Sequence, residues 1–306
     1  MSSVQTMKGW PSRIGPGDAI PHPFQKPFEA LRITGQEFPD VVYGPPFRFD
    51  RYENTAKLLA WAGERVACLD ARRGGVVTTE LALADVHRVE WGGALLESWI
   101  RLDAHGARGD ASIRVNFNTV CRDLYQPLVA AARERRYAGS RASAAVEVAK
   151  LDPLNRVDYK FMSFGREALL PGAEVRRFWM QPRVSERIAR VFKRTRIPAC
   201  MLLLTQSELI LIREGDGRNL GPYAGVWVYL PLDRIEKVVL EPVEERDVVQ
   251  LRILLPGEAV VRCDLDRGNE AAARELLGEL RAGPPTVTAS YPRSDLGLGL
   301  GPGPGP

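Results

Sequence analysis

The sequence predicts a mainly β protein of the α+β class, with two curled antiparallel barrels that are each capped by a C-terminal helix. Short apolar or alternating runs, separated by turn residues, recur through residues 66–117 and 174–265, as antiparallel strands require. Each series is followed by a segment with helical spacing of its apolar residues, at 123–136 and 269–282. Such a helix can cover one open end of a curled sheet.

The N-terminal segment, residues 1–47, is predicted to be an irregular arm. It is rich in proline and glycine, and aromatic residues are scattered among them. Proline has no N–H and cannot donate to a regular ladder. We therefore expect its aromatic side chains to lie along a domain surface, with part of the arm disordered. A proline-rich ligand is the alternative, but no clear P-x-x-P repeat is present.

The first module is predicted to span residues 48–138. Its opening stretch, 51–61, fits a short helix with Tyr52, Leu58 and Leu59 on the apolar side. Strands separated by glycine-bearing turns follow, and the helix at 123–136 closes the module.

The second module is predicted at 156–283, after an alanine-rich linker at 139–155 that favours a helix. It begins with a helix at 156–170. Its later strands include a hairpin around Pro256-Gly257-Glu258, and Asn269 stands at the start of the closing helix. The tail, 284–306, consists largely of glycine and proline towards its end, and we expect it to be disordered.

The two modules are predicted to be an internal repeat. When the two modules are aligned, residues 52–66 parallel 161–175 and residues 113–117 parallel 261–265. A helix follows the second matched segment in both modules. The first copy is shorter by about one strand pair in this alignment. The alternative is that two unrelated small antiparallel modules share a similar pattern.

Three stretches of the second module carry a resemblance. They are Leu-Leu-Leu-Thr at 202–205, Leu-Ile-Leu-Ile at 209–212, and Leu-Pro-Leu at 230–232 with apolar residues following at 235, 238 and 240. With the later hairpin and helix, this pattern resembles the otherwise uncharacterised bacterial pleckstrin-homology-like (PH-like) modules over residues 174–282. The resemblance implies a seven-stranded curled barrel with a C-terminal helix and a non-catalytic role.

A basic run lies between residues 174 and 200. The resemblance places it in the loop that carries the cationic pocket of PH domains, and arginine suits phosphate oxygens because its fork donates in pairs. The candidate site for an anion or partner is Arg183, Arg187, Arg190, Lys193, Arg194 and Arg196. The alternative is a solvated charged face over buried apolar residues.

No catalytic or metal-binding residues are assigned, and no cofactor is expected. The four cysteines lie far apart in the sequence without a C-x-x-C pair, and we interpret them as structural thiols. Asp103 and His105 are a weak acid–base candidate, expected to lie exposed in a hairpin turn.

The sequence thus predicts a non-catalytic binding or scaffold protein rather than an enzyme, with a protein partner or an anionic membrane surface as its ligand. The net charge of +4 is too small by itself to argue for nucleic acid or for a membrane. Because residues 1–20 have no apolar core, we expect a cytoplasmic protein, peripheral at a membrane if the basic run binds lipid. The alternative is a hydrolase or transferase with its site between the modules.

Overall fold

The computed structural model describes residues 10–32, 37–49, 52–94, 96–134, 144–187, 193–215, 224–244 and 247–280. These residues form a mainly β structure of antiparallel sheets, which confirms the predicted class. The predicted closed barrels are not formed, because each sheet in the described ranges has a linear strand order with two free edges. The predicted tail, 284–306, lies outside the described residues.

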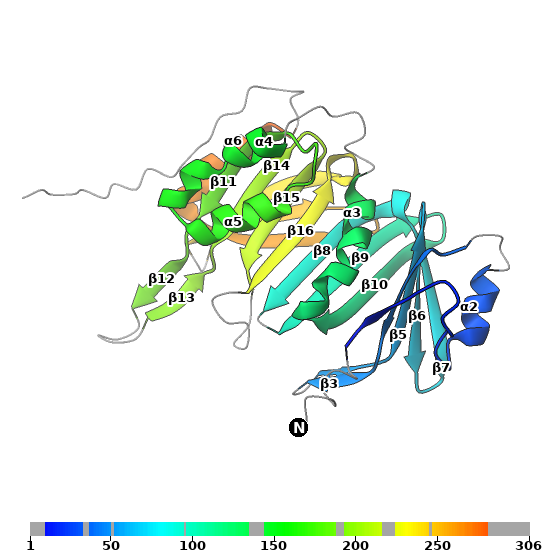
Figure 1. Ribbon diagram of the computed structural model, residues 1–306. Helices are drawn as coiled ribbons and strands as arrows, with labels where there is room; N and C mark the ends of the chain where they lie inside the picture. The colour runs from blue at the N-terminus through cyan, green and yellow to red at the C-terminus, as the bar shows by residue number, and fades with distance from the viewer. Residues whose placement is uncertain are drawn as a thin grey trace, which may run out of the picture.

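A seven-stranded sheet runs through the middle of the molecule (Figure 1). In spatial order its strands are β10 (Gly109–Asn118), β9 (Glu97–Gly106), β8 (Val86–Ala94), β16 (Gly225–Pro231), β15 (Glu208–Glu214), β14 (Cys200–Thr205) and β11 (Val175–Gln181). The first three strands come from the N-terminal half and the last four from the C-terminal half. The two halves therefore share one sheet, joined where β8 pairs with β16.

The seam between β8 and β16 places Trp91 opposite Trp227 in an antiparallel register. Next to this pair, Gly92 lies opposite Val226. A Cβ atom on Gly92 would lie 2.0 Å from Cζ2 of Trp99, so the indole ring occupies the space that a side chain would need. The indole Nε1 donates to Glu90 at 2.9 Å, which holds the ring in this position. Glycine at 92 thus permits the close approach of Trp99 to the seam.

A five-stranded sheet in the N-terminal half lies against the β9–β10 end of the seven-stranded sheet. Its strands in spatial order are β1 (Ser12–Ile14), β2 (Asp40–Gly44), β5 (Lys57–Ala62), β6 (Arg65–Arg72) and β7 (Gly75–Ala82). Helix α2 (Gln25–Arg32) packs on this sheet through Phe28 and Leu31, in a core that also contains Phe24. The predicted irregular arm is therefore wrong for this segment, because β1, α2 and β2 are regular and β2 pairs with β5. The proline at 27 is tolerated because it lies in the first turn of α2.

The helix predicted at 51–61 is also wrong. Residues 52–54 form β4 (Tyr52–Asn54), and β5 follows at 57–62. Strand β5 is buried on both of its faces. Leu59 and Trp61 belong to one apolar cluster, and Leu58 and Ala60 belong to another. A strand buried on both faces lacks the alternation that would distinguish it from a helix.

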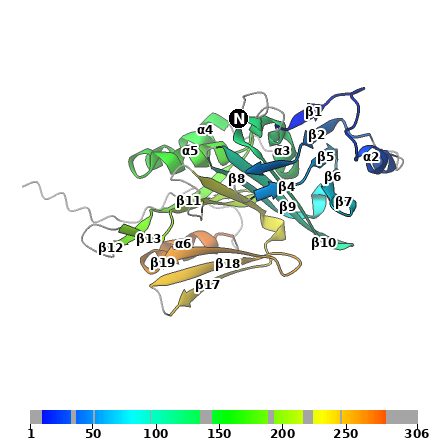
Figure 2. The same cartoon turned by 90° about the horizontal axis from the view of Figure 1, so that it is seen from below.

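A three-stranded sheet and a helix complete the C-terminal half. They are β17 (Lys237–Val243), β18 (Val248–Leu254), β19 (Val260–Asp266) and α6 (Glu270–Gly278). Figure 2 shows these elements on the side of the seven-stranded sheet away from α4 and α5. The predicted hairpin is confirmed as the β18–β19 turn, with Gly257 at φ +70°. The predicted helix start is also confirmed at Asn269, although its side chain makes no capping bond to α6.

The opposite face of the seven-stranded sheet is covered by α3 (Gln126–Glu134), α4 (Ala144–Ala149) and α5 (Tyr159–Ala168) (Figures 1 and 2). The helices predicted in the linker and at the start of the second module are thereby confirmed. One apolar core under these helices includes Val115 and Leu128 from the N-terminal half and Phe161 and Met201 from the C-terminal half. The two halves are therefore not separate hydrophobic units.

The same order of elements occurs in both halves. A first strand, β2 or β11, is followed by a short hairpin and then by three strands of the same sheet. The hairpin is β3 (Phe47–Phe49) with β4 in one half, and β12 (Val184–Arg187) with β13 (Lys193–Ile197) in the other. A short 3-10 helix, three strands, another 3-10 helix and an α-helix complete each half. The 3-10 helices are η1 (Leu83–Asp85) and η2 (Thr119–Leu124) in the N-terminal half, and η4 (Leu232–Arg234) and η5 (Arg267–Asn269) in the C-terminal half, while η3 (Asp152–Arg156) precedes α5.

This order corrects the predicted alignment of the repeat. Residues 52–66 contain strands, whereas 161–175 contain most of α5, so these segments do not correspond. Residues 113–117 and 261–265 do correspond, since they lie in the last strands, β10 and β19. The N-terminal half is not shorter by a strand pair, because its first strand, β2, lies within the segment predicted to be an arm.

Candidate functional site: the basic hairpin and the polar clusters around it

Most of the predicted basic run lies in or beside the hairpin β12–β13, which projects from the body of the molecule (Figure 1). In its register, Arg187 pairs with Lys193 and Arg194 pairs with Glu186. Arg194 is exposed. Arg190 lies outside the described residues, as do the side chains of Arg187 and Lys193. The chain thus brings Arg187, Lys193 and Arg194 together at one end of a hairpin.

Arg183 and Arg196, from the predicted site, are engaged in ion pairs within the protein. Arg183, just before β12, donates to Glu214 through Nε at 2.9 Å and Nη2 at 2.8 Å. Arg196, in β13, donates through Nη2 to Asp266 at 2.6 Å. These two arginines connect the base of the hairpin to β15 and β19. The geometry therefore gives them a structural role and leaves the outer end of the hairpin as the candidate anion site.

The carboxylate of Glu214 accepts hydrogen bonds from residues at both ends of the hairpin. It accepts bonds from Arg183, from Lys160 of α5, and from the backbone N–H of Ala199 at 3.1 Å. Burial acts to raise the pKa of this carboxyl group, but the bonds from Arg183 and Lys160 outweigh it and lower the pKa to about 2. Sequence reasoning did not identify Glu214. The available signal was a single acid at the end of the apolar run 209–212.

A second polar cluster lies between the two halves of the chain. A cavity of about 370 Å³ is lined by His87, Arg101 and Asp103 from the N-terminal half and by Gly257 and Val260 from the β18–β19 hairpin. At its rim, His105 Nδ1 and Asp110 Oδ1 are 2.7 Å apart. A Cβ atom on Gly257 would lie 2.0 Å from Asp110 Oδ1, so the hairpin turn approaches β10 closely.

Asp103 is buried within β9, which corrects the exposed hairpin turn predicted for it. Its Oδ1 accepts from Arg101 Nε at 2.8 Å and from Ser112 Oγ at 2.7 Å. This carboxylate oxygen is therefore already engaged by two donors within the protein. His87 is also buried, and neither ring nitrogen has a hydrogen-bond partner among the described residues. Burial lowers the pKa of His87, an effect that Asp103 partly offsets.

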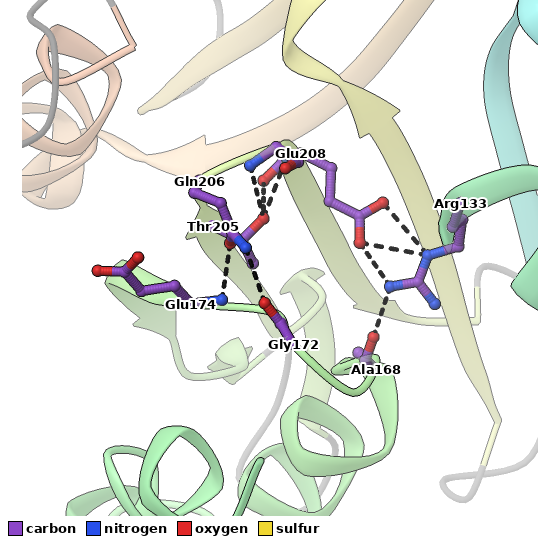
Figure 3. A network of polar contacts seen from close by, with 8 residues as sticks. Arg133, Ala168, Gly172, Glu174, Thr205, Gln206 and Glu208 are labelled. Carbon is purple, nitrogen blue, oxygen red and sulfur yellow. Dashed lines mark hydrogen bonds and ion pairs between the residues drawn. The ribbon is translucent and has the colours of Figure 1, made fainter. Parts of the chain in front are cut away.

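A buried ion pair joins the two halves on the other side of the sheet (Figure 3). Arg133 of α3 donates through Nη2 to Glu208 of β15 at 2.5 Å and to the backbone oxygen of Ala168 at 2.7 Å. The Arg133 guanidinium also lies 3.7 Å from the ring centroid of Tyr229. Neither charged side chain is more than 4% exposed. This contact was not predicted, since its partners are 75 residues apart.

The turn beside Glu208 is fixed by a second set of bonds in the same network (Figure 3). Thr205 Oγ1 donates to the backbone oxygen of Glu208 at 3.1 Å. Gln206 Nε2 donates to Gly172 O at 2.8 Å, and its Oε1 accepts from the N–H of Glu174 at 2.6 Å. These bonds tie the β14–β15 turn to the segment that leads from α5 into β11.

The four cysteines are free thiols and all are buried. Cys68, Cys200 and Cys263 lie in strands, as predicted, and Cys121 lies in η2. In the ranges that the structure describes, no three His, Cys, Asp or Glu side chains converge on a possible metal position.

The described helices include none that is both long and apolar enough to cross a membrane. Comparison of the chain with protein-family models and with curated proteins finds no match.

Proposed function

We propose that this chain is a non-catalytic binding protein built from two PH-like modules, and that the outer end of the β12–β13 hairpin binds an anionic membrane surface. The repeated order of elements, four strands of one sheet, three further strands and a closing helix, supports two copies of one module. Both copies also carry a hairpin between their first two sheet strands. This is the loop that forms the cationic pocket in PH domains.

The observation that carries the proposal is the charge of the projecting hairpin. Its strands and the residues that flank them contain Arg183, Arg187, Lys193, Arg194 and Arg196, against a single acid, Glu186. Arg183 and Arg196 hold the base of the hairpin, so the outer basic residues are carried away from the body on a supported arm. Each basic residue near an anionic bilayer contributes about 1 kcal/mol of binding free energy. The protein would then act at the cytoplasmic face of a membrane.

Vesicle co-sedimentation tests the proposal. The variant R187E/K193E/R194E should bind vesicles of phosphatidylcholine and phosphatidylserine at least about 100-fold more weakly than the wild type, since three attractive charges of about 1 kcal/mol each are lost and reversed. Vesicles of phosphatidylcholine alone should bind neither protein.

The matched control is K26E/R73E/R108E, which makes the same change in net charge at exposed positions away from the hairpin. It should keep most of the vesicle binding. If both triple variants lose binding equally, only net charge matters and the hairpin is not the site. If the wild type does not bind anionic vesicles but the hairpin variant loses a protein partner in a pull-down, the ligand is a protein.

The cavity between the halves favours a second candidate, a hydrolase or transferase, because His87, Asp103 and Asp110 line it. The two hydrogen bonds that Asp103 Oδ1 already accepts, from Arg101 and Ser112, count against this second candidate. Hydrolysis of p-nitrophenyl acetate or p-nitrophenyl phosphate by the wild type, with loss of that activity in D110N, would support the enzyme.

A further inference from the structure

Two of the buried cysteines lie side by side although they are distant in the sequence. Cys200 is the first residue of β14, in the seven-stranded sheet, and Cys263 lies within β19, in the three-stranded sheet. Both belong to the core between these sheets and both line one cavity. The other two cysteines, Cys68 and Cys121, lie in the N-terminal half, in β6 and η2. Cys200 and Cys263 therefore share one cavity, whereas Cys68 and Cys121 lie near Tyr125 instead.

The Cys263 thiol acts on the Cys200 thiol, and both line the same cavity. Contact with Cys263 is the largest of the effects that raise the pKa of the Cys200 thiol, followed by burial. The raised pKa of Cys68, about 11, comes chiefly from burial, and that of Cys121 comes from burial alone. Cys200 and Cys263 are thus neighbours in one core and one cavity, and Cys263 affects the Cys200 thiol.

The cavity gives this pair access to small molecules. Its volume is about 290 Å³, which is enough for several waters, and its lining also includes Pro198, Arg213 and Arg262. Cys263 is 8% exposed, whereas Cys200 is 1% exposed. Arg213 favours the thiolate of Cys200, although burial opposes it. A peroxide can enter such a cavity, and the reaction should be slow because little thiolate is present.

We propose that Cys200 and Cys263 are a thiol–disulfide redox pair, oxidised by a peroxide and reduced by a dithiol. One thiolate sulfur attacks an oxygen of hydrogen peroxide, the O–O bond breaks, and a sulfenic acid and one water form. The sulfur of the second cysteine then attacks the sulfenic sulfur, so that an S–S bond forms and a second water leaves. The two sulfurs together lose two electrons, and the peroxide takes them. A dithiol returns both electrons when it reduces the bond.

Such a bond would join the seven-stranded sheet to the three-stranded sheet. Cys200 also follows Ala199, whose N–H donates to Glu214, and lies three residues after the end of β13. Oxidation would therefore fix the strand that leaves the basic hairpin. The proposal does not depend on the hairpin binding a membrane.

Peptide mapping of the full-length protein tests the pair. The reduced native protein is treated with hydrogen peroxide, the peroxide is removed, and free thiols are alkylated in denaturant before digestion without reductant. We expect a cross-linked peptide containing Cys200 and Cys263, with Cys68 and Cys121 alkylated. Dithiothreitol should restore four alkylated cysteines, and the oxidised protein should unfold at a higher denaturant midpoint.

The variant C68S/C121S is the matched control and should still form the cross-link, whereas C263S should leave Cys200 alkylated or as a sulfenic acid. The mapping of the wild type decides the question even if a serine variant does not fold. Four alkylated thiols after prolonged peroxide treatment, or a cross-link that involves Cys68 or Cys121, would overturn the proposal.

Discussion

Arg133 of α3 and Glu208 of β15 form a buried ion pair that joins the N-terminal half of the chain to the C-terminal half, with Nη2 and Oε1 2.5 Å apart. The pair is backed by the ring of Tyr229 and by the backbone oxygen of Ala168. Two charges removed from water in this way are tolerated only while each neutralises the other.

Removal of one partner should therefore be costly. We expect R133M to lower the free energy of unfolding by about 3–5 kcal/mol, since Glu208 is left buried without its counter-charge. The double variant R133M/E208Q should recover a large part of this loss, because no net charge remains buried. Denaturant unfolding of the wild type, both single variants and the double variant measures the coupling. Additive losses would show that the two side chains do not depend on each other.

Glu214 should make the protein sensitive to acid. The pKa of its carboxyl group is about 2 in the folded protein against an ordinary 4.5. Its contribution is therefore complete above pH 4.5 and is lost as the pH falls from 4.5 towards 2. We expect E214Q to lower the free energy of unfolding by about 2–3 kcal/mol at pH 7 and by much less near pH 2. The variant E186Q, at an exposed position, should show neither effect.

His87 should produce a separate decline of stability at mildly acidic pH. Its pKa is lowered by burial, so the unfolded chain takes up a proton before the folded protein does. The stability that neutral His87 contributes is complete above pH 6.5 and falls as the pH drops below it, by at most about 1.4 kcal/mol per pH unit. The groups that act on the ring are Asp103, Asp110, His105 and Arg88. Unfolding measured from pH 8 to pH 5 should show a smaller slope for H87L than for the control H22Q.

Gly92 should be intolerant of even a methyl group. The added Cβ of G92A would overlap the ring of Trp99, and moving that ring disturbs its bond to Glu90 beside the seam. We expect a loss of about 1–3 kcal/mol in unfolding free energy. The control is G74A, in the β6–β7 turn, where an added Cβ meets no atom within 4 Å. Equal stability of the two variants would show that Trp99 moves without cost.

The sequence predicted the C-terminal half better than the N-terminal half, and the reason lies in the burial of particular residues. Runs such as Leu209–Ile212 and Val226–Leu230 were too short and too apolar for a surface helix. Turn residues at Gln206 and Gly215 delimited the first run, and Pro231 ended the second. Residues 57–62 were equally apolar but followed a polar stretch without glycine or proline, so a helix fitted the same pattern.

The missing parts of the candidate site are long-range contacts. The residues of the basic hairpin are close in sequence, so their clustering could be predicted, whereas Glu214 and Asp266, which hold Arg183 and Arg196, are distant. Likewise, nothing in the local pattern of residues 86–94 distinguishes pairing with β16 from a free edge, because the choice is made by a strand more than 130 residues away. Local periodicity indicates which residues form strands and helices. Which strand edges pair with each other depends on the whole folded chain.

The pairing of β8 with β16 determines which fragments of the chain can fold by themselves. A fragment that ends after α3 would expose the β8 edge and the apolar side chains of Val89 and Trp91 that now face β16 and the helices of the other half. A fragment that begins at α5 would expose the edge of β16. Neither piece would be a soluble minimal domain, so melting should be a single cooperative event, and truncations near residue 140 should aggregate.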